Sequence, residues 1–308
     1  MTAIDWHGFD AWEMQNDGVR VVIVPALGAK IVSLVDKVAG HEWLAPPTNP
    51  VRARTYGDTF TDHDLAGWDE MFPTIVECPS PHDASVTLPD HGEVWALSWD
   101  VMAQTDATLT LRVRGVALDY TLTRTATLLT DGLRLDYTLE NRTGRALPFL
   151  WAAHPLFNAD AHTTIEMPGV ERVVNVMDDP ALGAVGAMLD WPIATLANGQ
   201  RRPLNVAGPA SNRDCRKFYV PPEQVVSAAS LRQANTGCGL HMRWDAVTAP
   251  YVGVWVDEGT YSRTTTAALE PGSGYYDSLA LAQRNQRVAV VAAGEQVGWW
   301  LDVRLGDV

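Results

Sequence analysis

The sequence predicts an all-β protein, a large antiparallel β-sandwich with few short helices. Residues 109–114 and 133–139 alternate strictly between apolar and polar side chains, which is the period of a half-buried strand. Asp131-Gly132 and similar turn signals separate such runs at short intervals. Amphipathic helical periodicity is almost absent. Many short strands with so little helix favour an antiparallel sandwich.

In chain order, the first predicted strands cover residues 19–25 and 30–36, and residues 26–29 join them. Residues 93–155 read as five successive strands, one of them over residues 94–101. After a looser stretch at 167–209, which carries proline and glycine, the strands resume. They are predicted at residues 217–220, 239–244, 251–256, 264–269, 287–292 and 297–305. No linker separates the two halves, so residues 1–308 are predicted to form one domain.

The segment from residue 52 to residue 81 differs from the rest. It places Trp68, Met71 and Phe72 among several carboxylates, with glycines at 57 and 67 as hinges. Long irregular segments in compact domains are usually functional loops. Aromatic faces beside carboxylates suit a polyol, because its C–H faces stack on rings while its hydroxyls bond to charged acceptors.

Composition restricts the partners. The chain has 46% hydrophobic residues, 19% charged residues and a formal net charge of −14. There is no basic stripe, so we expect no nucleic-acid partner. No apolar run approaches the length of a membrane span, so we expect no membrane partner. Three cysteines without CxxC spacing and an N-terminus without a signal-peptide pattern favour the cytoplasm. We expect a monomer or a homodimer.

Two residues at strand ends are candidates for acid–base catalysis. His154 follows the apolar run 147–153 and precedes Pro155, which helps to end a strand. Glu270 closes the run 264–269 before Pro271-Gly272, where partial desolvation would raise the pKa of its carboxyl toward that of a general base. An imidazole and a carboxylate in one cleft provide an acid for one oxygen and a base for another. Each also has a structural interpretation, as a bonded edge histidine or a solvated carboxylate.

A third candidate, His91, lies in a turn before Gly92, which allows close approach of backbone or ligand. Other catalytic patterns are missing: the chain has no GxSxG, no Walker motif and no strand-associated GxGxxG. The histidine and aspartate clusters near residues 61–64 and 82–83 lack the spacing of a dedicated metal site, so we expect no metal. A glycoside hydrolase, which needs two carboxylates, stays open with Glu270 paired to Asp69, Glu70 or Asp257.

Several short motifs, taken in order, resemble those of the galactose mutarotase-like superfamily and its aldose 1-epimerases. They are Gly-Ala-Lys-Ile-Val-Ser-Leu at 28–34, Gly-Trp-Asp-Glu-Met-Phe-Pro at 67–73, His-Gly at 91–92, Ala-His-Pro-Leu-Phe at 153–157, Leu-Glu-Pro at 269–271 and Ala-Gly-Glu at 293–295. The resemblance spans nearly the whole chain. It implies a β-supersandwich that binds a monosaccharide in an open cleft without a cofactor.

The resemblance also implies roles. His154 would protonate the ring oxygen, Glu270 would take the proton of the anomeric hydroxyl, and His91 would help to hold the sugar. The family's arginine clamp and substrate-binding aspartate have no clear match. For these contacts the expected residues are Arg54 for the arginine, Asp214 or Asp257 for the aspartate, and Trp68, Asp69 and Trp255 as replacements.

Two further functions remain open at this stage. One is a carbohydrate-binding or sugar-sensing protein that keeps the fold without turnover. The other is a hexose-6-phosphate 1-epimerase, which needs an arginine cluster at the rim of the pocket. Its candidates are Arg52, Arg54, Arg213 and Arg216.

Overall fold

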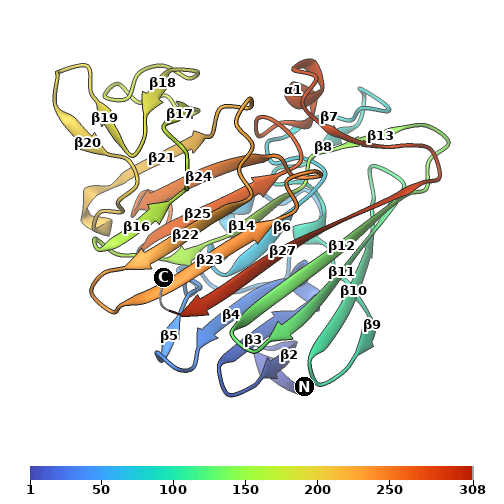
Figure 1. Ribbon diagram of the computed structural model, residues 1–308. Coiled ribbons are helices and arrows are strands. Elements are labelled where there is room, and N and C mark those ends of the chain that lie inside the picture. Colours follow the sequence, from blue (N-terminus) through green and yellow to red (C-terminus); the bar gives the residue numbers. More distant parts are fainter. Residues whose placement is uncertain (307–308) are drawn as a thin grey trace.

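The computed structural model describes residues 1–306 as a β-sandwich of two large antiparallel sheets (Figure 1). Residues 307 and 308, the end of the predicted domain, lie outside the described residues. The larger sheet contains 13 strands: β1 (Thr2–Trp6), β2 (Phe9–Gln15), β3 (Val19–Val24), β4 (Lys30–Asp36), β5 (His41–Glu42), β6 (Trp68–Met71), β14 (Ala152–Pro155), β15 (Phe157–Asn158), β17 (Arg172–Asn175), β18 (Met188–Asp190), β21 (Asp214–Tyr219), β24 (Tyr251–Glu258) and β25 (Thr265–Gly272).

The main order of this larger sheet is β1-β2-β3-β4-β6-β14-β25-β24-β21-β17-β18. Short β5 pairs with β4, and β15 pairs with β25. Strands that are distant in sequence therefore lie together at its centre, where β6, β14 and β25 are neighbours. This juxtaposition positions the candidate site.

The second sheet has eight strands in the order β16-β22-β23-β27-β12-β11-β10-β9. Their bounds are β9 (Asp100–Gln104), β10 (Thr108–Arg114), β11 (Tyr120–Leu129), β12 (Gly132–Asn141), β16 (Thr163–Glu166), β22 (Ala228–Gln233), β23 (Cys238–Trp244) and β27 (Gln296–Gly306). Three small pairs complete the strands: β7 (Cys78–Pro79) with β8 (Thr87–Leu88), β13 (Leu147–Phe149) with β26 (Ala289–Val291), and β19 (Ile193–Thr195) with β20 (Arg201–Pro203).

Helical structure is limited. One α-helix, α1 (Leu279–Arg284), follows β25, and its N-cap Ser278 accepts a hydrogen bond from the Leu281 N–H. The four 3₁₀ turns are η1 (Pro25–Leu27), η2 (Phe60–Asp62), η3 (Val94–Ala96) and η4 (Ala210–Asn212). Within residues 1–306, none of the helices has the length and apolar character to cross a bilayer.

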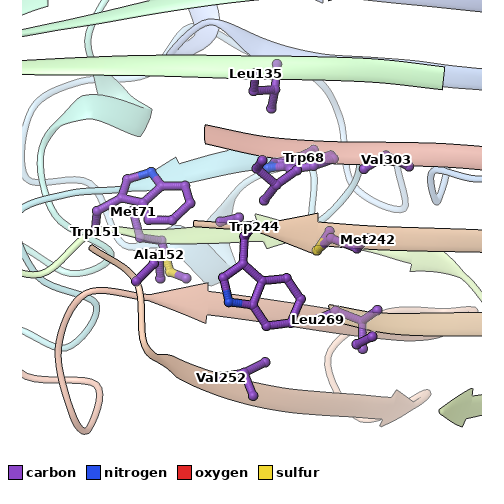
Figure 2. Packing of buried hydrophobic residues seen from close by; sticks show 14 of the residues in the cluster. Trp68, Met71, Leu135, Trp151, Ala152, Met242, Trp244, Val252, Leu269 and Val303 are labelled. Atoms are coloured by element: carbon purple, nitrogen blue, oxygen red, sulfur yellow. The ribbon is translucent and has the colours of Figure 1, made fainter. Parts of the chain in front are cut away.

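The facing sides of the two sheets form the main hydrophobic core. On β10 buried side chains alternate with half-buried or exposed ones, as the sequence pattern over residues 109–114 predicts. Figure 2 shows Trp68 and Trp244 with Leu135 and Val303 in this cluster. The core also encloses charged groups, and one of them is the Glu70 carboxylate, whose pKa burial raises. It accepts hydrogen bonds from the side chains of Arg124 (2.9 Å), Tyr137 (2.8 Å) and Trp151 (2.8 Å).

The predicted fold class is confirmed, and most predicted strands appear within a few residues of their expected bounds. The strand predicted at 94–101 is wrong: η3 forms there, and β9 begins at Asp100. The Trp95 and Trp99 indoles donate to the carbonyls of Asp90 and Val94, and both rings are buried. The looser stretch at 167–209 contains β17 to β20, and the first 15 residues contain β1 and β2.

Candidate active site

A cavity of about 320 Å³ lies on the face of the larger sheet that is turned away from the main core. The strands contribute His154, Glu270, Thr266, Trp255 and Lys217 to its wall. The connecting segments contribute Phe60, Thr61, Leu65, Ile75, Val76, His91, Leu156, Met177, Tyr261, Ser262 and Asp277. Polar groups are thus concentrated on the strand side, while much of the loop side is apolar.

Strand register builds the polar side. Alternate residues of a strand point to the same face, and paired residues on adjacent strands lie side by side. Continuing the observed pairs across the centre of the sheet aligns one row on five neighbouring strands: Asp69 (β6), His154 (β14), Glu270 (β25), Gly253 (β24) and Tyr219 (β21). The intervening residues Leu269, Val254 and Phe218 point into the core.

The two predicted catalytic groups are adjacent. His154 Nε2 lies 3.7 Å from Glu270 Oε1, and both residues line the cavity although they are 7% and 1% exposed. Burial lowers the pKa of His154 well below its ordinary value, and the positive charges of His91 and Lys217 add to this effect. Burial raises the pKa of Glu270, and Lys217 opposes that rise. The structure therefore brings together the two residues that the sequence singled out, and their roles as acid and base stay predictions.

His91 also lines the cavity. Its ring stacks on Phe60 with centroids 4.1 Å apart, and it lies 5.5 Å from the His154 ring. Asp90 Oδ1 lies 2.8 Å from His91 Nδ1 and fixes the ring orientation. Gly92 has a φ of +74°, and a Cβ there would lie 2.2 Å from the Phe72 carbonyl oxygen, so the turn requires glycine.

Sequence reasoning missed two charged residues in the site, Lys217 and Asp277. Lys217 Nζ lies 2.8 Å from Glu270 Oε2 and 2.9 Å from Asp277 Oδ1. The Tyr219 hydroxyl donates to the same Asp277 oxygen at 2.5 Å. Strand alternation placed Lys217 and Tyr219 on one face, opposite the core residue Phe218, and this signal was available in the sequence. Asp277 lies in the segment between β25 and α1, where no pattern pointed to it.

Arg54 and Asp69, predicted as sugar contacts, instead belong to a buried ionic ring beside the cavity, which we define as Lys30, Arg54, Asp64 and Asp69. Lys30 Nζ lies 2.8 Å from Asp64 and 2.6 Å from Asp69. Arg54 lies 2.9 Å and 2.6 Å from the same two carboxylates. Neither Arg54 nor Asp69 lines the cavity, and the charged groups of both are engaged in these ion pairs.

Three other predicted sugar contacts differ in outcome. Trp68 is fully buried in the core, since it directly precedes Asp69 on β6 and points to the opposite face. Asp214 is paired with Arg202 and Arg216 and lies outside the cavity wall. Trp255 does line the cavity.

Asp257 acts on the loop that follows its strand. Its carboxylate is buried and accepts the backbone N–H groups of Thr260, Tyr261 and Ser262. Tyr261 and Ser262 line the cavity, so Asp257 shapes the wall without reaching it. Within residues 1–306, no three His, Cys, Asp or Glu side chains are grouped as a metal site would require.

Comparison with known proteins identifies relatives at the level of structure. No family model matches the chain, and no curated protein matches it in sequence. Among solved structures, the Slr1438 protein of Synechocystis sp. PCC 6803 is similar over the full length of both chains, with a TM-score of 0.73 and 18% identity. A galactose mutarotase-like protein of Lactobacillus casei covers 96% of this chain and 100% of its own, with a TM-score of 0.69 and 19% identity.

A candidate aldose 1-epimerase of Escherichia coli K12 is also similar, with a TM-score of 0.71 and 15% identity over 97% of this chain and 99% of its own. These three structures share the whole architecture at low sequence identity. The resemblance predicted from short motifs is thereby confirmed at the level of the fold. The chain has the fold of the galactose mutarotase-like proteins.

Proposed function

We propose that this protein is an isomerase of the aldose 1-epimerase type, which interconverts the α and β anomers of a free monosaccharide. The observation that carries the proposal is the imidazole of His154 and the carboxylate of Glu270, 3.7 Å apart on the wall of a cavity of about 320 Å³. A cavity of this size is suited to a small ligand. The similarity to galactose mutarotase-like proteins supports the same activity.

The reaction breaks one ring bond and moves two protons. Glu270 takes the proton of the anomeric hydroxyl, and the electrons of that O–H bond form the C1 carbonyl. The bond between C1 and the ring oxygen breaks, and the ring oxygen takes a proton from His154. Both oxygens are bonded to C1, so an acid and a base that are close neighbours can reach them together. Rotation about the C1–C2 bond and reversal of these steps on the other face of the carbonyl give the other anomer.

Proton balance defines the active form of the pair. His154 must begin as imidazolium and Glu270 as carboxylate, because ring opening leaves the first neutral and the second protonated, and ring closure restores both. Burial lowers the pKa of His154 and raises the pKa of Glu270, so the two affinities for the proton approach one another. A proton moves with least cost between groups of similar pKa.

The wall of the cavity favours an uncharged sugar. Among the described residues, Lys217 is the one lysine or arginine that lines it, and two carboxylates already neutralise that ammonium group. The four arginines considered for a phosphate do not line the cavity. Arg52 and Arg213 donate to backbone carbonyls, and Arg54 and Arg216 are paired with buried carboxylates. We therefore propose a free sugar in preference to a hexose 6-phosphate.

Polarimetry of freshly dissolved α-D-glucose and α-D-galactose tests the proposal. The protein should accelerate the drift in optical rotation. Glu270→Gln and His154→Asn should each reduce turnover by about 10²–10⁴-fold with the fold intact. Glu171→Gln and His162→Asn, at exposed positions outside the cavity wall, serve as matched controls and should retain the full rate. Near-normal turnover in either site variant would remove that residue's role.

The same measurement separates the enzyme from a sugar-binding protein. A binder would shift a ligand-titration signal, such as the fluorescence of Trp255, and leave the drift rate at its value in buffer. That result with a broad panel of monosaccharides would refute the isomerase proposal.

We also propose a single domain over residues 1–308, a cytoplasmic location and a monomeric or homodimeric state. The main core contains side chains from both large sheets, which supports one folding unit. The three cysteines are free thiols, which suits a reducing compartment. Light scattering after size-exclusion chromatography distinguishes monomer from dimer.

A further inference from the structure

Lys217 occupies a place in the cavity that the acid–base chemistry of His154 and Glu270 does not by itself require. Its side chain is 11% exposed, and its ammonium group bridges two carboxylates, Glu270 Oε2 at 2.8 Å and Asp277 Oδ1 at 2.9 Å. The ammonium also lies 5.7 Å from the centre of the Tyr219 ring. A buried cation held between a catalytic base and a second carboxylate affects the charge of both.

We propose that Lys217 is a positioning residue that keeps Glu270 oriented and ionised for proton abstraction, and that Asp277 limits how strongly it does so. This proposal rests on the isomerase function above, since it assigns Glu270 the role of base. The proposal adds a group of three residues, which we call the charge device: Lys217 and Asp277 act on the reaction through Glu270.

Register and space explain how the device is held. Lys217 and Tyr219 project from β21 on the cavity side, two strands away from Glu270 on β25. On the intervening strand β24, Gly253 pairs with Tyr219 on one side and with Glu270 on the other. A Cβ at Gly253 would lie 3.2 Å from Glu270 Oε2 and 3.3 Å from Tyr219 Cζ. The absence of a side chain there leaves room for the Glu270 carboxylate, which Lys217 contacts, and for the Tyr219 ring.

Several ionisable groups near Glu270 affect the pKa of its carboxyl, each in a defined direction. Lys217 and, more weakly, His91 lower the pKa of Glu270, while burial and Asp277 raise it. His154 is the acid that shares the proton with it. Tyr219 acts through Asp277, because its hydroxyl donates to that carboxylate.

Lys217 itself stays charged over the working range. Burial alone would lower the pKa of its ammonium group, but Asp277 and Glu270 outweigh burial and raise that pKa above its usual value. The cation therefore acts as a fixed charge, and a change in pH alters Glu270 and His154 without altering their neighbour. Without this charge, burial would raise the pKa of Glu270 further.

Two substitutions should shift the pH profile of kcat/KM in opposite directions. Lys217→Met removes the charge and should move the profile to higher pH, because Lys217 lowers the pKa of both Glu270 and His154. We expect its loss of kcat/KM to be about tenfold or more greater near about pH 5.5 than near about pH 8.5. Asp277→Asn should move the acidic limb to lower pH, because Asp277 raises the pKa of Glu270.

Further variants separate charge from packing. Lys217→Arg keeps the positive charge and should keep the acidic limb near its wild-type position even where the altered geometry lowers kcat. Lys37→Met, at an exposed lysine far along the chain, is the matched control and should leave the profile unchanged. A residue with only a structural role would lower the rate at every pH without moving either limb.

An activity-independent readout keeps the two proposals distinguishable. The infrared carbonyl band of a protonated carboxyl, assigned to Glu270 by its loss in Glu270→Gln, reports ionisation without any substrate. In Lys217→Met this band should persist to higher pH than in the wild type, and in Asp277→Asn it should vanish at lower pH. If no sugar is turned over but the band shifts as expected, the isomerase proposal fails and the charge device stands. If neither substitution moves the band, or both move it in one direction, the device is refuted.

Discussion

Replacing Asp64 with asparagine tests how much the buried ionic ring beside the cavity stabilises the protein. The ring balances two positive charges against two negative ones, and each of its four side chains is at most 4% exposed. Asparagine keeps the shape of the side chain but leaves Lys30 and Arg54 with one carboxylate, Asp69, so one buried positive charge is no longer balanced. Breaking a buried ion pair in this way costs about 3–5 kcal/mol. We expect the free energy of unfolding near about pH 7 to fall by that amount.

The effect should depend on pH in a defined direction. Burial raises the pKa of Asp64, but Lys30 and Arg54 outweigh burial and hold it well below its ordinary value of 3.8. A depressed pKa stabilises the folded state above the unfolded value, and this stabilisation is lost as the pH falls toward the folded value. The difference in stability between the wild type and Asp64→Asn should therefore be constant from about pH 7 to about pH 5 and should narrow below about pH 4.

Urea unfolding followed by tryptophan fluorescence over this pH series measures both quantities. Asp62→Asn is the matched control, because Asp62 lies in the same segment but is exposed. The free energy of unfolding of this variant should stay within about 0.5 kcal/mol of the wild-type value. A loss below about 1 kcal/mol for Asp64→Asn at neutral pH would refute the assigned role of the ring. A difference that widens in acid would refute the sign of the pKa argument.

Two further predictions concern the cavity. Gly253→Ala should lower kcat by about tenfold, because the added Cβ would lie 3.2 Å from the Glu270 carboxylate and displace it by a few tenths of an ångström. An unchanged kcat would show that the reaction does not need the free space above Gly253. A hexose 6-phosphate should compete poorly with the free sugar in polarimetry, since Lys217 is already neutralised by two carboxylates. Inhibition by the phosphate at lower concentration than by the free sugar would contradict an uncharged substrate.

The sequence predicted the fold class and singled out both candidate catalytic residues for related physical reasons. Period-two alternation identifies strands, and the proline after His154 and after Glu270 predicted that each lies at a strand end. In the structure β25 continues through Pro271 to Gly272, so Glu270 lies within its strand, and strand alternation turns its side chain to the cavity side. The two residues lie on adjacent strands. Their proximity depends on the strand order β6-β14-β25, which joins segments more than 80 residues apart and is not encoded in local periodicity.

The errors have equally local causes. Residues 68–71 were interpreted as part of an irregular loop, so Trp68 and Asp69 were assigned to the same surface. In the structure they are consecutive residues of β6, and Trp68 faces the core while Asp69 faces the cavity side. Asp69 is then neutralised by Lys30 and Arg54, contacts that cross between β4, β6 and the loop before η2. No single segment carries the signal for such a ring.

The arrangement of charge around the pair explains why its two members respond differently to their surroundings. Fixed cations lie on both sides of the row, Lys30 in the ionic ring and Lys217 beside Asp277. For His154, burial and both cations act in the same direction and lower its pKa. For Glu270, burial and Lys217 act against each other. His154 is therefore the residue whose proton the site holds less tightly than usual, which suits the proposed role of delivering a proton to a departing ring oxygen.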